Sequence, residues 1–511
     1  MVIISEKQKN IKQSLCLFCS LGCGTSFRSQ GDEITAIDYD RENPINLGSL
    51  CPRGHYNFEL LNHPRRLVYP QIGARKTSWD DALDFARQQL KEFEADSIGI
   101  ILSSNASNED ACLAAKLAKS LGTKNICAAG NPFDQEAYQG EKWETPGAEL
   151  STLDEIGKAE TLLIIGDILR RSPVLSWRIN QVKYGKRGNR IIVADPNKTH
   201  TSWFATSHLR HQPGTAALLL LAMVELIGRE TGQGELGVDI DAVAVKIGLP
   251  VDLLVVAARD FHASPSGTII VTPSPAEKRN DLIVYFAKLL ASLSPGKKYI
   301  PFYGYGNTRG VNLVLDRCLE EHISYPGMID KIAAEQIKAL IMLGEDLAGT
   351  HPEIEKKFKH MRFVAASNYF VNDLVDDSIV IFPLASQMEE GGTYVMADGR
   401  LENRLPIAPK VGGRSNGEIA AGLMGQEFNL NKTLEETGVI IRQGIPAAKT
   451  GIEEKIAEAQ QIAAGEKFPP AEITHFGNNR MTRNFFWFRV NPHTLNMPCG
   501  QGVGVNNKVE G

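Results

Sequence analysis

The sequence predicts an α/β protein whose sheets are parallel and covered by helices on both faces, and two observations carry this prediction. Short apolar runs recur along the chain, several of them end at Gly or Asp, and helical stretches separate them. Strands buried on both faces are apolar throughout, and parallel strands are joined by such helical crossovers. The pattern starts after about residue 78, and a group of four cysteines stands before it. The runs that we expect to be strands cover residues 97–102, 160–165, 190–194, 267–272, 337–343, 362–366 and 378–383.

The four N-terminal cysteines are spaced to hold one metal centre. Cys16, Cys19 and Cys23 lie within eight residues, and Cys51 follows after 27 intervening residues. Four thiolates complete the ligand set of a [4Fe-4S] cluster, although the spacing differs from the common ferredoxin run. A structural zinc site is the alternative, but its usual second C-x2-C knuckle is missing because Cys51 stands alone. We therefore expect an iron–sulfur cluster bound by these four residues.

Two helices can be predicted from their ends. Ser78 followed by Asp81 is typical of a capping box, in which each residue satisfies a backbone N–H group at the start of a helix. A second helix is predicted over residues 109–121, because Gly122 follows its last periodic position.

Small and acidic residues follow three of the predicted strands. Ligands of open α/β sheets lie beyond the carboxyl ends of the strands, so these residues are candidates for binding a ligand. An ordinary role in turns and helix caps is the alternative. No G-x-G-x-x-G or P-loop motif is present, so no motif supports NAD, FAD or ATP binding. The candidates are Gly166, Asp167, Asp195, Gly344, Glu345 and Asp346.

Composition excludes several classes of protein. The 511 residues carry a net charge of −5, which argues against a nucleic-acid partner. The longest apolar run, residues 216–224, ends at Glu225 and is too short to span a bilayer, so no direct membrane insertion is expected. Eight cysteines without a disulfide framework suit a reducing compartment, and we expect a cytoplasmic protein in which Cys112, Cys318 and Cys499 are core thiols.

Taken together, the motifs resemble the molybdopterin oxidoreductase family, which contains formate dehydrogenases, nitrate reductases and the large cluster-carrying subunit of respiratory complex I. The resemblance runs from about Cys16 to Arg414, and it is specific only as a combination, since each motif alone is weak. The motifs are the cysteine group with C-P-R-G-H at 51–55, H-P-R-R-L-V-Y-P at 63–70, I-V-A-D-P at 192–196, Q-P-G-T at 212–215, I-K-A-L-I-M-L-G-E-D at 337–346, I-F-P-L-A-S at 381–386, E-E-G-G-T-Y at 389–394 and D-G-R at 398–400.

The resemblance implies an N-terminal [4Fe-4S] domain followed by two Rossmann-like parallel-sheet domains, one inserted in the other. The expected divisions are residues 1–68 for the cluster domain, 69–146 and 333–440 for the two parts of the outer α/β domain, 147–332 for the inserted α/β domain, and 441–511 for a C-terminal helix and aromatic tail.

A bis-molybdopterin guanine dinucleotide carrying molybdenum or tungsten is the cofactor that the resemblance implies. The strand-end candidates named above match the places where the family contacts this dinucleotide. Arg53 stands where family members keep Lys or Arg, and a cation there would lie between cluster and pterin.

The sequence departs from the family at the position of its metal ligand, which is often Cys or selenocysteine. That position falls at about Phe133, which cannot bind a metal; Asp134 follows directly and is the candidate ligand, whereas Cys127 lies about six residues too early. Arg309 is the candidate active-site cation for holding a substrate carboxylate. The β-barrel domain that usually closes over the pterins is also expected to be absent, so that either a separate chain supplies it or the pterin site is degenerate.

Two functions follow from the resemblance. The first is an iron–sulfur redox subunit of a cytoplasmic formate- or formyl-group-dehydrogenase-like complex, passing electrons through the cluster next to the pterin. The alternative is an electron-relay subunit like that of complex I, with the cluster but no turnover at a metal pterin. Both imply partner redox subunits that carry iron–sulfur clusters, flavin or both, and the aromatic run 485–488 is the candidate docking surface.

Overall fold

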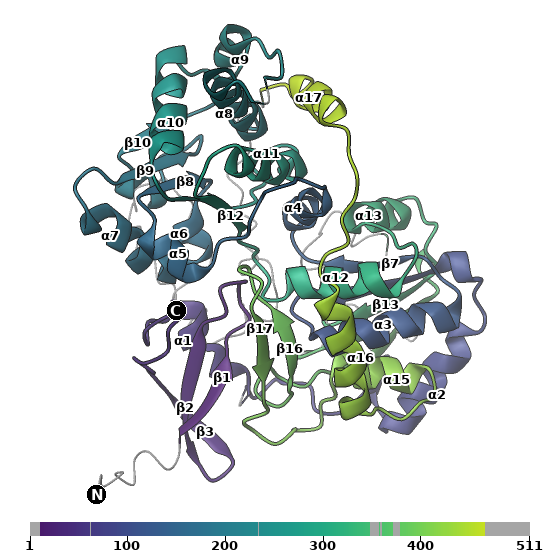
Figure 1. Ribbon diagram of the computed structural model, residues 1–511. Helices are drawn as coiled ribbons and strands as arrows, with labels where there is room; N and C mark the ends of the chain where they lie inside the picture. Colours follow the sequence, from purple (N-terminus) through teal and green to yellow (C-terminus); the bar gives the residue numbers. More distant parts are fainter. Residues whose placement is uncertain are drawn as a thin grey trace, which may run out of the picture.

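The computed structural model describes residues 11–464, apart from Asn62, Gly234 and the segments 348–356, 358–359 and 371–378. The aromatic run 485–488 and Cys499 lie outside these residues. Two parallel sheets with their helices form the two large bodies, and a small N-terminal sheet lies beside the segment that joins them (Figure 1). None of the helices in the described part of the chain is long and apolar enough to cross a membrane.

The N-terminal region is a small antiparallel sheet of order β1-β2-β3. The chain turns between β1 and β2 through the first three cysteines, and Cys51 immediately precedes α1. The sheet thus presents one tight loop, and the short helix brings the fourth cysteine back to it. The elements are β1 (Ile11–Leu15), β2 (Gly24–Gln30), β3 (Glu33–Asp38), α1 (Pro52–His55) and the 3-10 helix η2 (Asn57–Leu60).

The larger sheet has the order β5-β4-β15-β14-β13-β6-β7, in which β15 to β7 are parallel and the short β4 and β5 form an antiparallel edge. Alternate residues of its strands face α2, α3, α12 and α15 on one side and α13 on the other. Its strands are β4 (Gln71–Ile72), β5 (Arg75–Lys76), β6 (Ile98–Ser103), β7 (Ile126–Ala129), β13 (Ala339–Leu343), β14 (Phe363–Asn368) and β15 (Ile379–Pro383), and its helices are α2 (Trp79–Leu90), η3 (Ala95–Ser97), α3 (Asn108–Leu121), α12 (Thr308–Cys318), α13 (Tyr325–Ala333) and α15 (Asn416–Leu423).

The second sheet, of order β10-β9-β8-β11-β12, is parallel throughout and is built from residues that lie between β7 and β13 in the sequence. One sheet is therefore inserted in the other, as predicted. The elements are α4 (Pro132–Lys142), α5 (Leu153–Lys158), β8 (Thr161–Ile165), α6 (Ile168–Arg171), η4 (Pro173–Leu175), α7 (Ser176–Gly185), β9 (Arg190–Ala194), η5 (Thr201–Phe204), β10 (Ser207–Leu209), α8 (Ala216–Thr231), α9 (Ile240–Ile247), α10 (Val251–Ala263), β11 (Gly267–Val271), α11 (Asn280–Ser292) and β12 (Lys297–Pro301).

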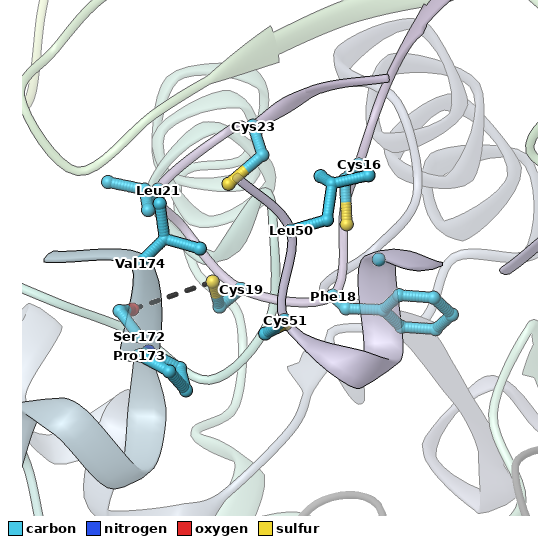
Figure 2. A pocket seen from close by; sticks show the side chains of 11 residues that line it. Cys16, Phe18, Cys19, Leu21, Cys23, Leu50, Cys51, Ser172, Pro173 and Val174 are labelled. Atoms are coloured by element: carbon cyan, nitrogen blue, oxygen red, sulfur yellow. Dashed lines mark hydrogen bonds between the residues drawn. The ribbon is translucent and has the colours of Figure 1, made fainter. Parts of the chain in front are cut away.

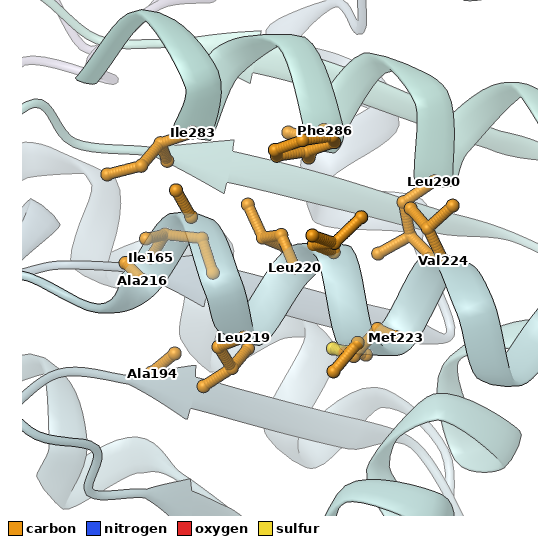
Figure 3. Packing of buried hydrophobic residues seen from close by; sticks show 14 of the residues in the cluster. Ile165, Ala194, Ala216, Leu219, Leu220, Met223, Val224, Ile283, Phe286 and Leu290 are labelled. Atoms are coloured by element: carbon orange, nitrogen blue, oxygen red, sulfur yellow. The ribbon is translucent and has the colours of Figure 1, made fainter. Parts of the chain in front are cut away.

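Helix α8 explains the longest apolar run of the sequence. Its residues 216–225 are all buried, and Figure 3 shows them between the strands of the sheet and α11. Leu219 and Leu220 pack in a cluster that includes Ile165 and Ala194 from the sheet and Phe286 from α11. A helix with this composition is a buried core helix.

The remaining elements close the structure. The hairpin of β16 (Gly392–Val395) and β17 (Leu401–Arg404) lies between the N-terminal sheet and the larger parallel sheet (Figure 1). Helix α16 (Leu430–Arg442) packs on α3 and α12, and α17 (Ile452–Gln460) packs on α8.

The predicted start of α2 at Ser78 and end of α3 at Gly122 are confirmed, but the capping box of α2 is incomplete, because the Asp81 carboxylate accepts from the Ser78 hydroxyl and not from its backbone N–H group. The Ser78 hydroxyl accepts a hydrogen bond from the Asp81 N–H group at the start of α2, and Gly122 ends α3 with a left-handed φ of 69°. Each predicted strand is present to within three residues at either end.

Candidate functional site

The four cysteines line one pocket beneath the N-terminal sheet (Figure 2). The loop that carries the first three is closed by a hydrogen bond from the Cys16 N–H group to the Cys23 carbonyl oxygen, with an N···O distance of 2.9 Å. Ser20, at the tip of the loop, is bound to the inserted domain, because its hydroxyl accepts a 2.8 Å hydrogen bond from the Tyr303 N–H group. The loop is therefore anchored at both its base and its tip.

The rest of the pocket wall comes from other elements. Cys51 lies at the N-terminus of α1, where backbone N–H groups favour a negative charge. Ser172, from the segment between α6 and η4, donates a 3.5 Å hydrogen bond to the Cys19 sulfur, which Figure 2 marks. Leu50 and Val174 supply apolar surface. Four cysteine sulfurs are the ligands that a [4Fe-4S] cluster requires, and here an apolar wall surrounds them.

Electrostatics within the pocket favour a bound cation. Burial, followed by the neighbouring Cys51 and Cys19, raises the pKa of Cys16, and burial raises the pKa of Cys23 in the same way. Four thiolates in such a pocket are stable only beside positive charge, which cluster irons supply. Arg53 contributes further positive charge from α1, and its guanidinium donates a hydrogen bond to the Arg171 carbonyl oxygen. This geometry fits the predicted cluster.

The strand-end candidates follow β8 and β13, where each sheet reverses its strand order, except for Asp195, which follows the neighbouring strand β9. In the inserted sheet β9 is on one side of β8 and β11 is on the other, so the reversal falls between β8 and β11. Gly166 follows β8 there with a φ of 83°, and a Cβ on it would lie 2.8 Å from the Thr272 carbonyl oxygen. In the larger sheet the reversal falls between β6 and β13, where Gly344 has a φ of 76°. Reversal points are the usual ligand sites of such sheets.

Buried carboxylates accompany both glycines. Burial raises the pKa of Asp195, which follows β9, to about 7, and burial followed by the nearby Asp346 raises the pKa of Glu345 to about 8. Asp346 is itself buried. Asp167 accepts a 2.5 Å hydrogen bond from the Thr201 hydroxyl. Buried carboxyl groups at the carboxyl ends of both sheets suit the donor groups of a guanine dinucleotide, so the residues present fit the pterin cofactor.

The two predicted catalytic residues both have buried partners. Asp134, on α4, is fully buried and forms an ion pair with Arg171, with 2.5 Å between Oδ1 and Nη1. It also accepts hydrogen bonds from the Gly304 N–H group, at 3.0 Å, and from the Asn131 amide, at 2.9 Å. Such a set of contacts is typical of a structural carboxylate, and the assignment of Asp134 as a metal ligand stays a prediction.

Arg309 occupies the first turn of α12 and forms a buried ion pair with Glu141 of α4. Its second contact is a 3.1 Å hydrogen bond to the Ala397 carbonyl oxygen. The Tyr303 hydroxyl donates a 2.6 Å hydrogen bond to the same Glu141 carboxylate. Arg309 thus joins α4, α12 and the β16–β17 hairpin, and its role toward a substrate also stays a prediction.

Sequence reasoning missed Arg171 and Glu141, which hold the two predicted residues. Arg171 follows the Gly166–Asp167 turn closely, so its position near the site was readable, but its partner lies 37 residues earlier in the chain. Cys127, the nearest thiol, is buried in β7, and burial raises its pKa, which is typical of an unreactive core thiol.

Comparison with known proteins identifies the family. The family model described as molybdopterin oxidoreductase matches residues 66–424, and the model described as its Fe4S4 domain matches residues 10–63. The chain belongs to the molybdopterin oxidoreductase family. This membership confirms the resemblance, the fold class and the two cofactor types expected of the chain.

Curated relatives within this family are dehydrogenase and oxidoreductase subunits. The F420-dependent formate dehydrogenase subunit alpha of Methanocaldococcus jannaschii is 25% identical over 450 residues, covering 77% of this chain and 66% of the relative. The NADPH-Fe(3+) oxidoreductase subunit alpha of Geobacter sulfurreducens is also 25% identical, covering 80% of this chain and 55% of the relative. This chain therefore spans between about half and two thirds of the length of these relatives.

Among solved structures, acetylene hydratase from Pelobacter acetylenicus matches with a TM-score of 0.64 at 16% identity, covering 90% of this chain and 75% of that chain. At this identity the match shows a shared fold.

Proposed function

We propose that this chain is the iron–sulfur redox subunit of a formate- or formyl-group-dehydrogenase-like complex. Electrons pass through a [4Fe-4S] cluster held by Cys16, Cys19, Cys23 and Cys51. The observation that carries the proposal is the single pocket lined by these four thiols, with Arg53 beside it. The formate dehydrogenase alpha subunits among its relatives support the substrate class.

A bis-molybdopterin guanine dinucleotide is the second cofactor in this proposal, and it supplies a two-electron redox centre based on molybdenum or tungsten. Gly166 and Gly344 allow the tight, positive-φ turns of the chain at the two reversal points where the cofactor would bind. Asp195, Glu345 and Asp346 accept hydrogen bonds from its polar groups. Arg53, between the two cofactors, stabilises the additional negative charge of their reduced states.

The proposed partners are further redox subunits carrying iron–sulfur clusters, flavin or both, because one cluster needs a donor or an acceptor nearby. Relatives named as alpha subunits support this part of the proposal. The proposed location is the cytoplasm, because the cysteines among the described residues are all free, and free thiols persist in reducing compartments.

A relay without turnover at the metal is the second candidate. It is favoured by the contacts of Asp134 and Arg309, since each is already bound to a buried partner of opposite charge. In this case the cluster carries electrons between partner subunits and the reversal points serve only to hold the fold together.

Metal analysis of the purified native complex distinguishes the candidates. The dehydrogenase-like subunit contains about four irons and stoichiometric molybdenum or tungsten per chain, and it reduces an artificial acceptor with formate. Iron without molybdenum or tungsten indicates the relay. Zinc in place of iron, or unchanged iron in a Cys51→Ser variant, contradicts the cluster assignment that both candidates share.

A further inference from the structure

Two cysteines outside the cluster pocket contact each other. Cys112 lies on α3 and Cys318 is the last residue of α12, and both are free. Both thiols line the same cavity at the interface between the two helices, and each is close enough to affect the pKa of the other. The sequence predicts both as core thiols, and Cys112 is buried, but Cys318 is only partly buried.

The pair lines a cavity of about 410 Å³ between α3, α12 and α16. Lys116 and Lys119 contribute positive charge to the lining, and Glu436 pairs with Lys116 across the cavity. Val439 of α16 lines it too and is half exposed, so the cavity reaches the surface of the protein. Two lysines against one glutamate leave the lining with net positive charge.

The environment makes one sulfur of the pair the better nucleophile. The neighbouring Cys318 thiol, and then the charge of Lys116, lower the pKa of Cys112, whereas the contact with Cys112 raises the pKa of Cys318. A thiolate attacks a disulfide, and a neighbouring thiol then resolves the mixed disulfide. Cys112 has the properties of the attacking sulfur, and Cys318 those of the resolving sulfur.

We propose that Cys112 and Cys318 are a redox modification site that forms a reversible disulfide by exchange with a small, anionic, low-molecular-weight disulfide. The Cys112 sulfur bonds to one sulfur of that molecule and releases the other as a thiolate. Cys318 then displaces the second thiol, after losing its proton, and the Cys112–Cys318 bond forms. Two electrons pass from the cysteines to the small disulfide, which leaves as two thiols.

The bond would join α3 to α12 at a point remote from the cluster. These helices also hold the β16–β17 hairpin at their first turns, where Glu109 accepts hydrogen bonds from Thr393 and Asn307 accepts one from Val395. The disulfide would therefore stiffen the helix pair that supports the hairpin.

The test equilibrates the cluster-loaded protein, without oxygen, in glutathione buffers from fully reduced to fully oxidised. Samples are quenched in acid, alkylated, digested and analysed by mass spectrometry. We expect a cross-linked Cys112–Cys318 peptide that becomes the main form in oxidised buffer and disappears with dithiothreitol. Cys127, which is buried in β7, is the internal control and stays unmodified. Absence of the cross-linked peptide at every buffer ratio would overturn the proposal.

Two single variants test the assigned roles and do not depend on forming the bond. In Cys318→Ser the mixed disulfide cannot be resolved, so glutathione should accumulate on Cys112. In Cys112→Ser we expect roughly tenfold less glutathione on Cys318 at equal times, because the remaining thiol is less ionised. Equal labelling of the two variants, with iron content matching the parent, would contradict the assignment of Cys112 as the attacking sulfur.

Discussion

Replacing Asp134 by Asn separates a structural carboxylate from a metal ligand. The substitution keeps the size of the side chain and removes the negative charge from the ion pair with Arg171. The Gly304 N–H group retains an oxygen to donate to, since the Asn side chain still carries one. The charge of Arg171 is then left without its counter-ion, with 12% of its side chain exposed.

The expected cost is large. Removing one partner of a buried ion pair destabilises a protein by about 3–5 kcal/mol. Arg171 also donates a 2.9 Å hydrogen bond to the Pro273 carbonyl oxygen and lies over the Phe133 ring, with 5.4 Å from its Cζ atom to the ring centroid. These contacts partly compensate for the lost carboxylate charge. We therefore expect a destabilisation at the lower end of that range, about 3 kcal/mol. That is a sizeable fraction of the typical stability of a domain, about 5–15 kcal/mol.

A double-mutant cycle in urea measures this. Asp134→Asn and Arg171→Met should each lower the unfolding midpoint, and the double variant should cost less than their sum by about 2 kcal/mol. Glu149→Gln, which breaks an exposed pair with Lys298, is the matched control and should cost less than about 1 kcal/mol. If Asp134→Asn has the same urea midpoint as the parent but loses molybdenum or tungsten, the reasoning is wrong and the carboxylate is a metal ligand.

Three further predictions concern the two cofactor regions. Gly166→Ala should lower the melting temperature more than Gly188→Ala. Both residues have positive φ, but only at Gly166 would the added Cβ meet another atom, the Thr272 carbonyl oxygen. Equal shifts of the melting temperature would contradict the close contact. The pKa of Asp195 is about 7 in the folded chain, above its unfolded value, so this group stabilises the fold at low pH and the contribution is lost as pH rises toward and past 7. Between about pH 5 and about pH 8, the cofactor-free parent should therefore lose more of its urea midpoint than Asp195→Asn, and parallel losses would refute this. Arg53→Met should lower the cluster reduction potential in an anaerobic titration, because a neighbouring positive charge is removed. Arg53→Lys keeps the charge and should change the potential less. An unchanged potential in both variants would mean that Arg53 does not act on the cluster.

Local features of the fold could be predicted from the sequence because neighbours along the chain determine them. A run such as residues 162–165 is apolar throughout, so it can only be stable when both of its faces are covered. The closing glycine of α3 and the Ser78 N-cap of α2 depend on residues within one turn. The spacing of the first three cysteines likewise limits them to one loop. Each of these features can be read without knowing the rest of the molecule.

Partners that depend on tertiary structure could not be predicted. Arg309 and Glu141 are 168 residues apart, and Asp134 meets Arg171 only because α4 packs beside the end of α6. The positions of Asp134 and Arg309 in the family pattern therefore suggested catalytic roles. Their actual contacts depend on how the helices pack, which the pattern does not reveal. Cys318 shows the same limit, since only the packing of α12 on α3 brings it to Cys112.

The segment from Gly166 to Ser172 connects the reversal point of the inserted sheet to the cluster pocket. Because the segment is short, the two places must be neighbours. The six Cα-to-Cα steps between Gly166 and Ser172 span at most about 22 Å when fully extended, and helix α6 shortens this distance because a helix rises only about 1.5 Å per residue. Ser172 then contacts Cys19 directly, and the Arg171 carbonyl oxygen accepts the hydrogen bond from Arg53. A dinucleotide bound at Gly166 would thus lie on the same short segment that forms the wall of the cluster pocket. Because Asp134 holds the Arg171 side chain of this segment, Asp134→Asn should also shift the cluster potential, whereas Glu149→Gln should leave it unchanged. An unchanged potential in a destabilised Asp134→Asn variant would show that the segment keeps its place without the ion pair.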